Sequence, residues 1–355
     1  MIKLAVYTDI HFSFNKGAFN YTDGSSSTKL KSIELFFDKL YDWCLSNRPN
    51  AIINCGDTVT DIGIIDSPTI NSINRCFSKI SRLAIPHYVL LGNHDLYNDN
   101  HTDPIISFLS EFDNTYIIDR PTSSNLQIAN IDNFAFFIPY YKPNVLLQKL
   151  EDHYNSIKQS KLCFLHADVL HPKGSRYGLD LNYLSTNFPN TTFINGHLHI
   201  PFSQLNFFNI GSTLTHNHTE WSDNRGLNII QLSSLSSPPI ITVDKSFNTF
   251  DIKEISIESI DQFLQLNLPY NLFLKINLLK PVDLEKLESI LAFYRGYRLE
   301  KRYYQDSDID IEIALESNTD PYSILLEYLK HKEDEIAKLE TKVTPQFLLD
   351  LCKSL

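Results

Sequence analysis

Five short apolar segments of this sequence end in side chains that bind metals or carry protons. The first leads into Asp9-Ile10-His11, the second into Gly56-Asp57 and the third into Gly92-Asn93-His94-Asp95. The fourth ends at His166, and the fifth leads into Gly196-His197-Leu198-His199. A single histidine on a strand is more often a satisfied core residue than a ligand. Five such elements in this order, each after an apolar run, indicate one shared site.

The residue types at these five positions suit a pair of divalent cations. Two ions held about 3.5–4 Å apart can polarise a phosphate and ionise a water that they share. Such a pair needs a carboxylate that bridges it and damps its repulsion, and it needs neutral imidazoles and an amide oxygen so that the site stays net positive toward phosphate. Nitrogen and oxygen ligands suit manganese, iron or zinc, and no thiolate is placed to select a soft ion.

The segments that carry these residues are predicted as buried strands of an α/β fold. They are apolar and bounded by turn residues, and they span residues 3–8, 51–55, 87–91, 162–165 and 192–194. Apolar residues at steps of three and four predict helices between them, over about 33–44 and 70–80. This alternation predicts a β-sandwich flanked by helices, with the active residues at strand ends.

The last third of the chain changes in composition after about Ser233 and is predicted to form two further units. Alternating apolar residues indicate strands at 272–278, 297–303 and 309–315, and Asp283 can cap a helix between the first two. Asp320-Pro321 and Thr344-Pro345 can open two more helices, whose apolar faces could pack on this chain or on a partner. The expected organisation is a catalytic domain at 1–250, a small α+β capping domain at 265–316 and a helical tail at 319–355.

Charge and composition limit the possible functions. The net charge of -11 and the pI near 5.5 argue against independent, high-affinity nucleic-acid binding through a broad basic face. A nucleic-acid substrate stays possible, because bound cations or a basic partner can reverse the local potential. The five cysteines are scattered and form no CxxC pair, so neither a disulfide framework nor a zinc ribbon is expected. With no signal peptide and no long apolar span, we expect a cytoplasmic protein that does not contact a membrane.

As a set, these motifs resemble those of the calcineurin-like metallophosphoesterases, written D-x-H, G-D, G-N-H-D, H and G-H-x-H, over roughly residues 3–200. The resemblance implies one metal held by Asp9, His11 and His199, and a second held by Asn93, His166 and His197, with Asp57 bridging them. It also implies that His94 faces the phosphate and helps the leaving oxygen depart. Asp95 would then hold His94 in its working tautomer.

Phosphatases, cyclic-nucleotide phosphodiesterases and nucleases share this motif set, so the branch depends on other features. Residues 85–91, 208–214 and 223–227 are similar to the corresponding segments of SbcD-type nucleases and of T-even-type phage recombination endonuclease subunits. The layout of nuclease domain, small cap and helical tail also resembles theirs, although after residue 235 the likeness is architectural.

This resemblance implies a two-metal-dependent DNA exo/endonuclease, with Mn²⁺ as the expected ion. Its expected partners are DNA, an SbcC-like coiled-coil ABC ATPase bound by the tail, and a second copy in a homodimer. Two alternatives stay open, a small-molecule or cyclic-nucleotide phosphodiesterase and a non-catalytic scaffold. Thr60 stands where many cellular members have a histidine, which puts any contact made there in doubt. His216-Asn217-His218 spells H-N-H but lacks the context of an HNH nuclease, and it is predicted as a loop near the substrate or as plain surface.

Overall fold

The protein is described from a computed structural model. The structure describes residues 1–16, 22–23, 26–97, 104–123, 134–171, 177–216, 224–234, 237–249, 252–268, 273–292, 294 and 296–301. All of them fall within the first of two compact units, which spans residues 1–302. The predicted tail at 319–355 and the strand expected at 309–315 lie outside the described residues.

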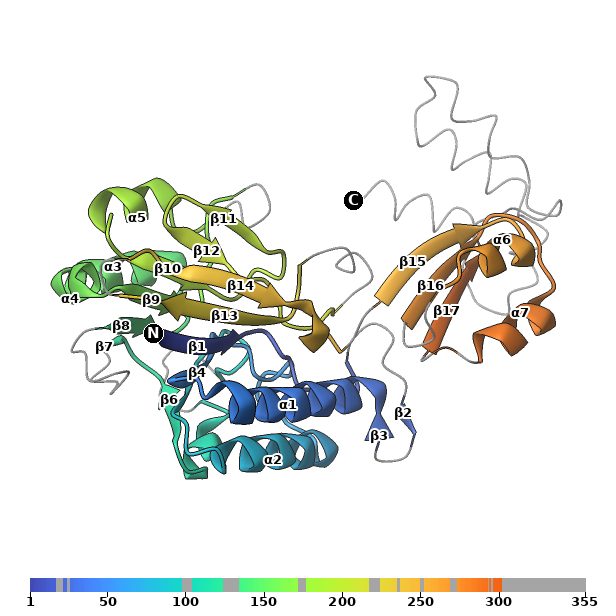
Figure 1. The fold of residues 1–355 in the computed structure, drawn as a ribbon, viewed down its shortest axis with the longest axis horizontal. Coiled ribbons are helices and arrows are strands. Elements are labelled where there is room, and N and C mark those ends of the chain that lie inside the picture. The colour runs from blue at the N-terminus through green and yellow to red at the C-terminus, as the bar shows by residue number, and fades with distance from the viewer. Residues whose placement is uncertain are drawn as a thin grey trace, which may run out of the picture. The chain divides into compact units, whose positions relative to one another are not determined.

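Two six-stranded sheets, counted over the described residues, face each other at the centre of the catalytic domain (Figure 1). The first has the order β14-β13-β1-β4-β5-β6, formed by β1 (Ile2–Tyr7), β4 (Ala51–Asn54), β5 (His87–Leu90), β6 (Thr115–Ile118), β13 (Leu227–Leu232) and β14 (Ile240–Asp244). The second has the order β11-β12-β10-β9-β8-β7, formed by β7 (Thr122–Ser123), β8 (Ala135–Ile138), β9 (Leu162–Leu165), β10 (Thr192–Asn195), β11 (Phe202–Gln204) and β12 (Phe207–Asn209). Leu4 and Val6 of one sheet and Phe137 and Phe164 of the other belong to a single buried apolar layer.

Helices cover the outer faces of both sheets, so the predicted β-sandwich with flanking helices is confirmed. On the first sheet, α1 (Thr28–Asn47) and α2 (Ser67–Ser81) lie side by side (Figure 1) and pack phenylalanines against Tyr7 and Val89. On the second, α3 (Pro143–Asp152), α4 (Tyr154–Gln159) and α5 (Leu181–Asn187) cover the outward side chains of β8, β9 and β10. Short pieces complete the domain: β2 (Thr22–Asp23), β3 (Ser26–Ser27), and the 3-10 turns η1 (Ser107–Glu111) and η2 (Lys245–Phe247).

Parallel strand order brings the motif-bearing loops to one region. Strands β1, β4 and β5 are mutually parallel, so the loops after them leave the same edge of the first sheet. Strands β9 and β10 are parallel in the second sheet, so their following loops also share an edge. Backbone hydrogen bonds tie these loops together, as from Asp9 N to Gly56 O at 2.9 Å and from Thr213 N to Thr8 O at 3.1 Å.

A smaller α/β module follows the sandwich along the chain. It has three parallel strands, β15 (Ile252–Ile257), β16 (Phe273–Leu278) and β17 (Gly296–Lys301), and two helices, α6 (Ile260–Gln265) and α7 (Leu284–Leu291). The predicted strand at 272–278 corresponds to β16, and the Asp283 carboxylate caps α7 by accepting from Lys286 N. The module starts with β15 and α6, before the predicted boundary at 265. None of the helices in the described ranges has the length and hydrophobicity that a bilayer span requires.

Candidate active site

The first group of donors lies around one oxygen of the Asp57 carboxylate. His11 Nε2 is 3.5 Å from Asp57 Oδ2 and 3.2 Å from His199 Nε2. Asp9 Oδ1 lies 3.8 Å from His11 Nε2 and 3.7 Å from His199 Nε2. These four residues come from three loops, after β1, β4 and β10, and their donor atoms face one another.

The second group lies around the other oxygen of the same carboxylate. His166 Nε2 is 3.4 Å from Asp57 Oδ1 and 3.2 Å from Asn93 Oδ1. His197 Nδ1 is 3.2 Å from His166 Nε2. The structure therefore brings together all seven residues that the sequence places as metal ligands, in the two groups that the resemblance implies, with Asp57 between them.

The spacing of these atoms fits two cations. Donor atoms at right angles around an ion with bonds of about 2.1 Å stand about 3 Å apart, close to the 3.2 Å that separates His11 Nε2 from His199 Nε2. Asp9 Oδ1 is buried and has no hydrogen-bond partner among the described residues. An orphaned buried carboxylate oxygen is costly unless a cation satisfies it, so the donor set fits a metal ion.

The charges within the site are strongly coupled. Burial alone would raise the pKa of Asp57, but the His166 imidazolium and its hydrogen bond, together with His11, lower that pKa well below its usual range. Burial would likewise lower the pKa of His166, but the Asp57 carboxylate raises it above its usual value. Without metal, these shifts place the proton on His166 and the negative charge on Asp57, and a bound cation would displace that proton.

The backbone of the ligand loops is held in an unfavourable conformation. Asp9, His11, Asp57 and His197 have positive φ angles of 51°, 54°, 53° and 74°, a region that costs non-glycine residues on the order of 1–3 kcal/mol each. Hydrogen bonds of the Asp9 side chain help to maintain it: Asp9 Oδ2 accepts from the adjacent Thr8 Oγ1 at 2.6 Å and, from another loop, from His197 N at 3.1 Å. A Cβ at Gly92 would collide with the Asp57 carboxylate, so a glycine is needed where the backbone of this loop approaches Asp57.

Each of four site histidines has one ring nitrogen bound to an oxygen outside the cluster. Such a bond fixes the ring and leaves its other nitrogen facing the site. The pairs are His166 Nδ1 with Cys55 O (2.7 Å), His11 Nδ1 with Val59 O (3.3 Å), His94 Nδ1 with Thr60 O (2.8 Å) and His197 Nε2 with Asp168 Oδ1 (3.1 Å).

The role expected for Asp95 therefore needs correction. The group that holds the His94 tautomer is the Thr60 carbonyl, which accepts from Nδ1–H. The buried Asp95 carboxylate instead accepts from Thr58 N at 2.9 Å, Val59 N at 3.2 Å and Gly92 N at 2.9 Å. Asp95 thus joins the loop of Asp57 to the loop of His94 and positions both.

His94 lies beside the first donor group, and one of its ring nitrogens is within 4.8 Å of donor atoms of His11 and Asp57. Its ring is edge-on to His11, with centroids 4.9 Å apart, and its backbone N donates to Asp57 Oδ1 at 2.9 Å. Because Nδ1 is bound to Thr60, Nε2 is the nitrogen free to act on a bound phosphate.

Three residues of the site lie outside the motifs of the sequence. Asp168, two residues after His166, orients His197 through its Nε2. His216, predicted as a loop residue near the substrate or as plain surface, packs its ring 4.9 Å from those of His11 and His199. Burial and these two neighbours lower the pKa of His216 well below its usual value.

Lys29 is the third of these residues, and it puts a buried amine beside the site. It lies in the first turn of α1, is 7% exposed, and donates from Nζ to Thr60 Oγ1 at 3.3 Å. Burial lowers the pKa of its ammonium to about 7. Thr60 Oγ1 also donates to His11 O at 2.8 Å, so this residue connects Lys29, His11 and His94.

The glycine-serine turn at 211–212 and the entry to β13 meet behind the site. The buried Arg225 side chain donates to Ser212 Oγ and, at 3.3 Å, to Ser212 O. Ser212 N in turn donates to His199 O at 3.2 Å. The glycine-serine turn and the Asn224-Arg225-Gly226 entry to β13 thus jointly support one of the ligands.

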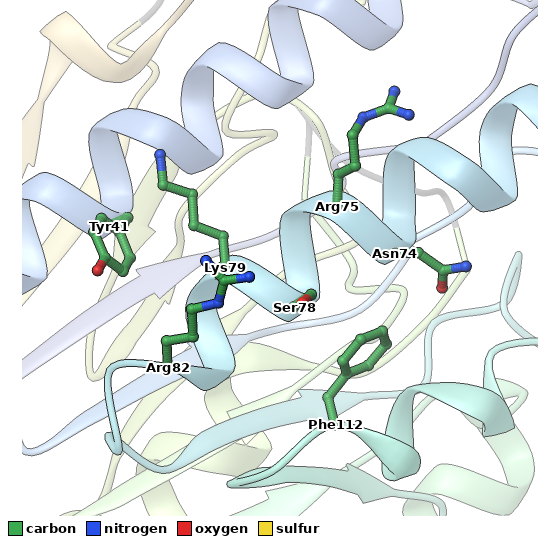
Figure 2. Close-up of a pocket in the computed structure, with 7 residues that line it drawn as sticks. All are labelled: Tyr41, Asn74, Arg75, Ser78, Lys79, Arg82 and Phe112. Atoms are coloured by element: carbon green, nitrogen blue, oxygen red, sulfur yellow. The ribbon is translucent and has the colours of Figure 1, made fainter.

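A groove lies elsewhere on the domain, over α1 and α2 (Figure 2). It encloses about 740 Å³ and is lined by Tyr41, Asn74, Arg75, Ser78, Lys79, Arg82 and Phe112. Because α2 runs antiparallel to β4 and β5, its C-terminal half points away from the catalytic loops. Arg75 pairs with Glu34 and Lys79 with Asp38, so carboxylates of α1 offset two of the three cations.

Comparison with known proteins supports the family. No curated protein matches the sequence. Among solved structures, a dimetal phosphatase from Danio rerio is 11% identical with a TM-score of 0.42, covering 65% of this chain and 92% of its own. A 5′-nucleotidase precursor from Thermus thermophilus is also 11% identical, with a TM-score of 0.37, and the match covers 68% of this chain and 53% of that one. Residues 2–231, well over half of the chain, match the calcineurin-like phosphoesterase family. The chain therefore belongs to the calcineurin-like phosphoesterase family and is a metal-dependent phosphoester hydrolase.

Proposed function

We propose that this hydrolase cuts DNA, as the nuclease subunit of an SbcCD-like repair or recombination complex. The observation that carries the proposal is the module at 252–301, which follows the family-matched region and is not needed for a phosphoesterase site. The contact between Arg225 and Ser212 supports it further, because it joins two segments that resemble SbcD-type nucleases.

The residues of the site divide the work of phosphodiester hydrolysis. One cation would be held by Asp9, His11 and His199. The other would be held by Asn93, His166 and His197, and Asp57 would bind both. When bound, these ions polarise the phosphate and ionise a water; Mn²⁺ is the expected ion. His94 presents Nε2 to the phosphate and stabilises the charge that develops as the 3′ or 5′ oxygen leaves. Asp95, through the two loops that it joins, keeps His94 near Asp57.

The nuclease assay separates metal binding from catalysis. With Mn²⁺, His94→Ala should keep both metals but lose cleavage by about 10²–10⁴-fold, as for a lost acid–base group. Asp57→Ala should lose both metal and cleavage. His153→Ala, at the junction of α3 and α4, is the control and should cut DNA normally. Normal cutting by His94→Ala or Asp57→Ala would refute the assignment of the site.

A small-molecule or cyclic-nucleotide phosphodiesterase is the second candidate, and the net charge of -11 favours it. Comparing turnover of linear DNA with that of cyclic nucleotides, at equal enzyme and Mn²⁺, decides between the two. Much faster turnover of cyclic nucleotides would replace the nuclease proposal.

The partners belong to the same proposal. A coiled-coil ABC ATPase would bind the segment at 319–355, and a second copy would bind through the catalytic domain. Affinity purification of the tagged full chain from its native host should recover such an ATPase, whereas a chain ending at residue 302 should not. Recovery of the ATPase by both forms would place its binding site outside the tail.

A further inference from the structure

His216 lies within the first donor group, although no motif includes it. Its ring stands edge-on to His11 and tilted against His199, with both centroids 4.9 Å away. One ring nitrogen of each of these three histidines lies within 4.8 Å of the other two. Three imidazoles this close, beside the orphaned oxygen of Asp9, form a potential cation site.

The hydrogen bond made by His216 is of the same kind as those of the other site histidines. His216 Nε2–H donates to Asp9 O at 2.6 Å. His166 and His11 each bind a backbone carbonyl through one nitrogen and face the cluster with the other. This arrangement is typical of a metal-ligating histidine, because the outer bond fixes the tautomer and the orientation of the ring. In His216 the nitrogen that would bind a cation is then Nδ1.

The backbone that carries His216 is firmly attached to the domain. Thr213 N donates to Thr8 O at 3.1 Å, and Thr8 N donates to Thr213 Oγ1 at 2.9 Å. Thr215 N donates to Asn248 Oδ1 at 3.2 Å, and Asn248 Nδ2 donates back to Thr215 Oγ1 at 2.9 Å. A ring carried by a backbone fixed in this way can serve as a pre-organised ligand.

We propose that His216 is an additional ligand of the cation position formed by Asp9, His11 and His199. The inference concerns the metal centre and does not depend on which phosphodiester is cut. It makes the first position richer in imidazole than the second, where Asn93 supplies an amide oxygen. Imidazole donors favour zinc, iron or cobalt over manganese, so the two positions should differ in metal preference.

The other explanation of the same geometry is that His216 only holds the Asp9 loop, whose φ is 51°. Two substitutions separate these roles. In His216→Gln the side-chain amide reaches as far as Nε2, so it can keep the bond to Asp9 O but loses the Nδ1 donor. In His216→Asn the amide oxygen lies near the position of Nδ1, so a donor stays while the bond to Asp9 is lost.

Titration of the metal-free full chain with Co²⁺ measures the outcome without any turnover. If His216 is a ligand, His216→Gln weakens one of the two binding steps by at least about tenfold, whereas His216→Asn weakens it less. His153→Gln is the matched control, with the same chemical change away from the cluster, and should bind as the wild type does. Normal Co²⁺ binding by His216→Gln together with weak binding by His216→Asn would overturn the proposal and leave the loop-holding role.

A second measurement needs only the wild-type protein. In the Co²⁺-loaded form, each metal-bound imidazole gives strongly shifted ring-proton resonances. Histidine-labelled protein should show such resonances from five histidines, namely His11, His166, His197, His199 and His216. Strongly shifted resonances from only four histidines would overturn the proposal, even if neither variant folds.

Discussion

Asp168 shows how much the site depends on residues that bind no metal. Its carboxylate accepts from His197 Nε2–H at 3.1 Å, and this bond turns His197 Nδ1 toward His166 Nε2. The hydrogen bond to His197 lowers the pKa of Asp168, so the carboxylate is ionised at neutral pH. A negatively charged acceptor both selects the tautomer and makes the imidazole a better donor.

Asp168→Asn should weaken Mn²⁺ binding at the second position by about tenfold. The reason is that an amide can present either its oxygen or its NH₂ group to His197, and the latter favours the wrong tautomer. Calorimetric titration of the metal-free protein measures the change. Asp180→Asn is the matched control, because asparagine caps α5 about as well as aspartate does. Equal Mn²⁺ affinity in wild type and Asp168→Asn would show that the hydrogen bond from His197 to Asp168 does not affect metal binding by His197.

The sequence predicts a site residue when its side chain carries the chemistry and when a neighbouring element of the sequence fixes its position. Asp57 and His166 each follow an apolar strand directly, so both type and place can be read from the sequence. The acceptor for His94 is a backbone carbonyl, which every residue has, so nothing in the sequence marked Thr60 as that acceptor. His216 enters the cluster only because its segment packs against the loop after β1, a long-range contact with no local pattern.

At the scale of elements, the packing of β1, β5 and α2 buries a histidine in the core. His87 opens β5, is 1% exposed, stacks on Phe77 of α2, and is hydrogen-bonded through Nε2 to Tyr7 Oη at 2.9 Å. Burial lowers the pKa of His87 to about 3. Between pH 6.5 and 3 the unfolded chain therefore binds a proton at this position that the folded chain does not.

His87 should make folding stability fall as the pH falls through this window. Its contribution is fully present above about pH 6.5, and going from pH 7 to pH 5 should cost about 2 kcal/mol. His87→Gln keeps a hydrogen-bonding group for Tyr7 but cannot titrate. Between pH 7 and pH 5, the free energy of unfolding of this variant should therefore fall by about 2 kcal/mol less than that of the wild type. Urea unfolding at pH 7 and pH 5, in the presence of a chelator, measures the free energy of unfolding of both proteins. All other titratable groups are the same in the two proteins. Tyr7→Phe keeps the histidine and should retain the acid sensitivity; equal pH dependence in wild type and His87→Gln would contradict the assignment.

Element boundaries in the sandwich were predictable, but the start of the second module was not. Apolar spacing gave α1 and α2 and the strands at 51–55 and 162–165 to within a few residues. In β15, Ile255 and Ile257 do alternate as buried residues. A short alternating segment of this kind does not by itself predict a strand, because it becomes stable only when it pairs with a neighbouring strand. Here that neighbour is β16.

The whole molecule is acidic, although the substrate proposed for it, DNA, is a polyanion. A net charge of -11 repels DNA at long range. The groove over α1 and α2 (Figure 2) does little to change this, since Glu34 and Asp38 offset Arg75 and Lys79. Two divalent cations beside Asp9 and Asp57 would instead turn the centre of the site positive.

DNA binding by the isolated chain should therefore depend on divalent metal. His94→Ala, which should hold metal without cutting, is expected to bind a fluorescent oligonucleotide at least about tenfold more tightly in Mn²⁺ than in a chelator at low salt, because the two ions attract phosphate directly. Asp57→Ala should show no such gain, and it controls for any effect of Mn²⁺ on the DNA itself. Fluorescence anisotropy measures both. Equal binding by His94→Ala with and without metal would mean that side chains such as Arg82 attract the DNA, and Arg82→Ala would then weaken binding at every metal concentration.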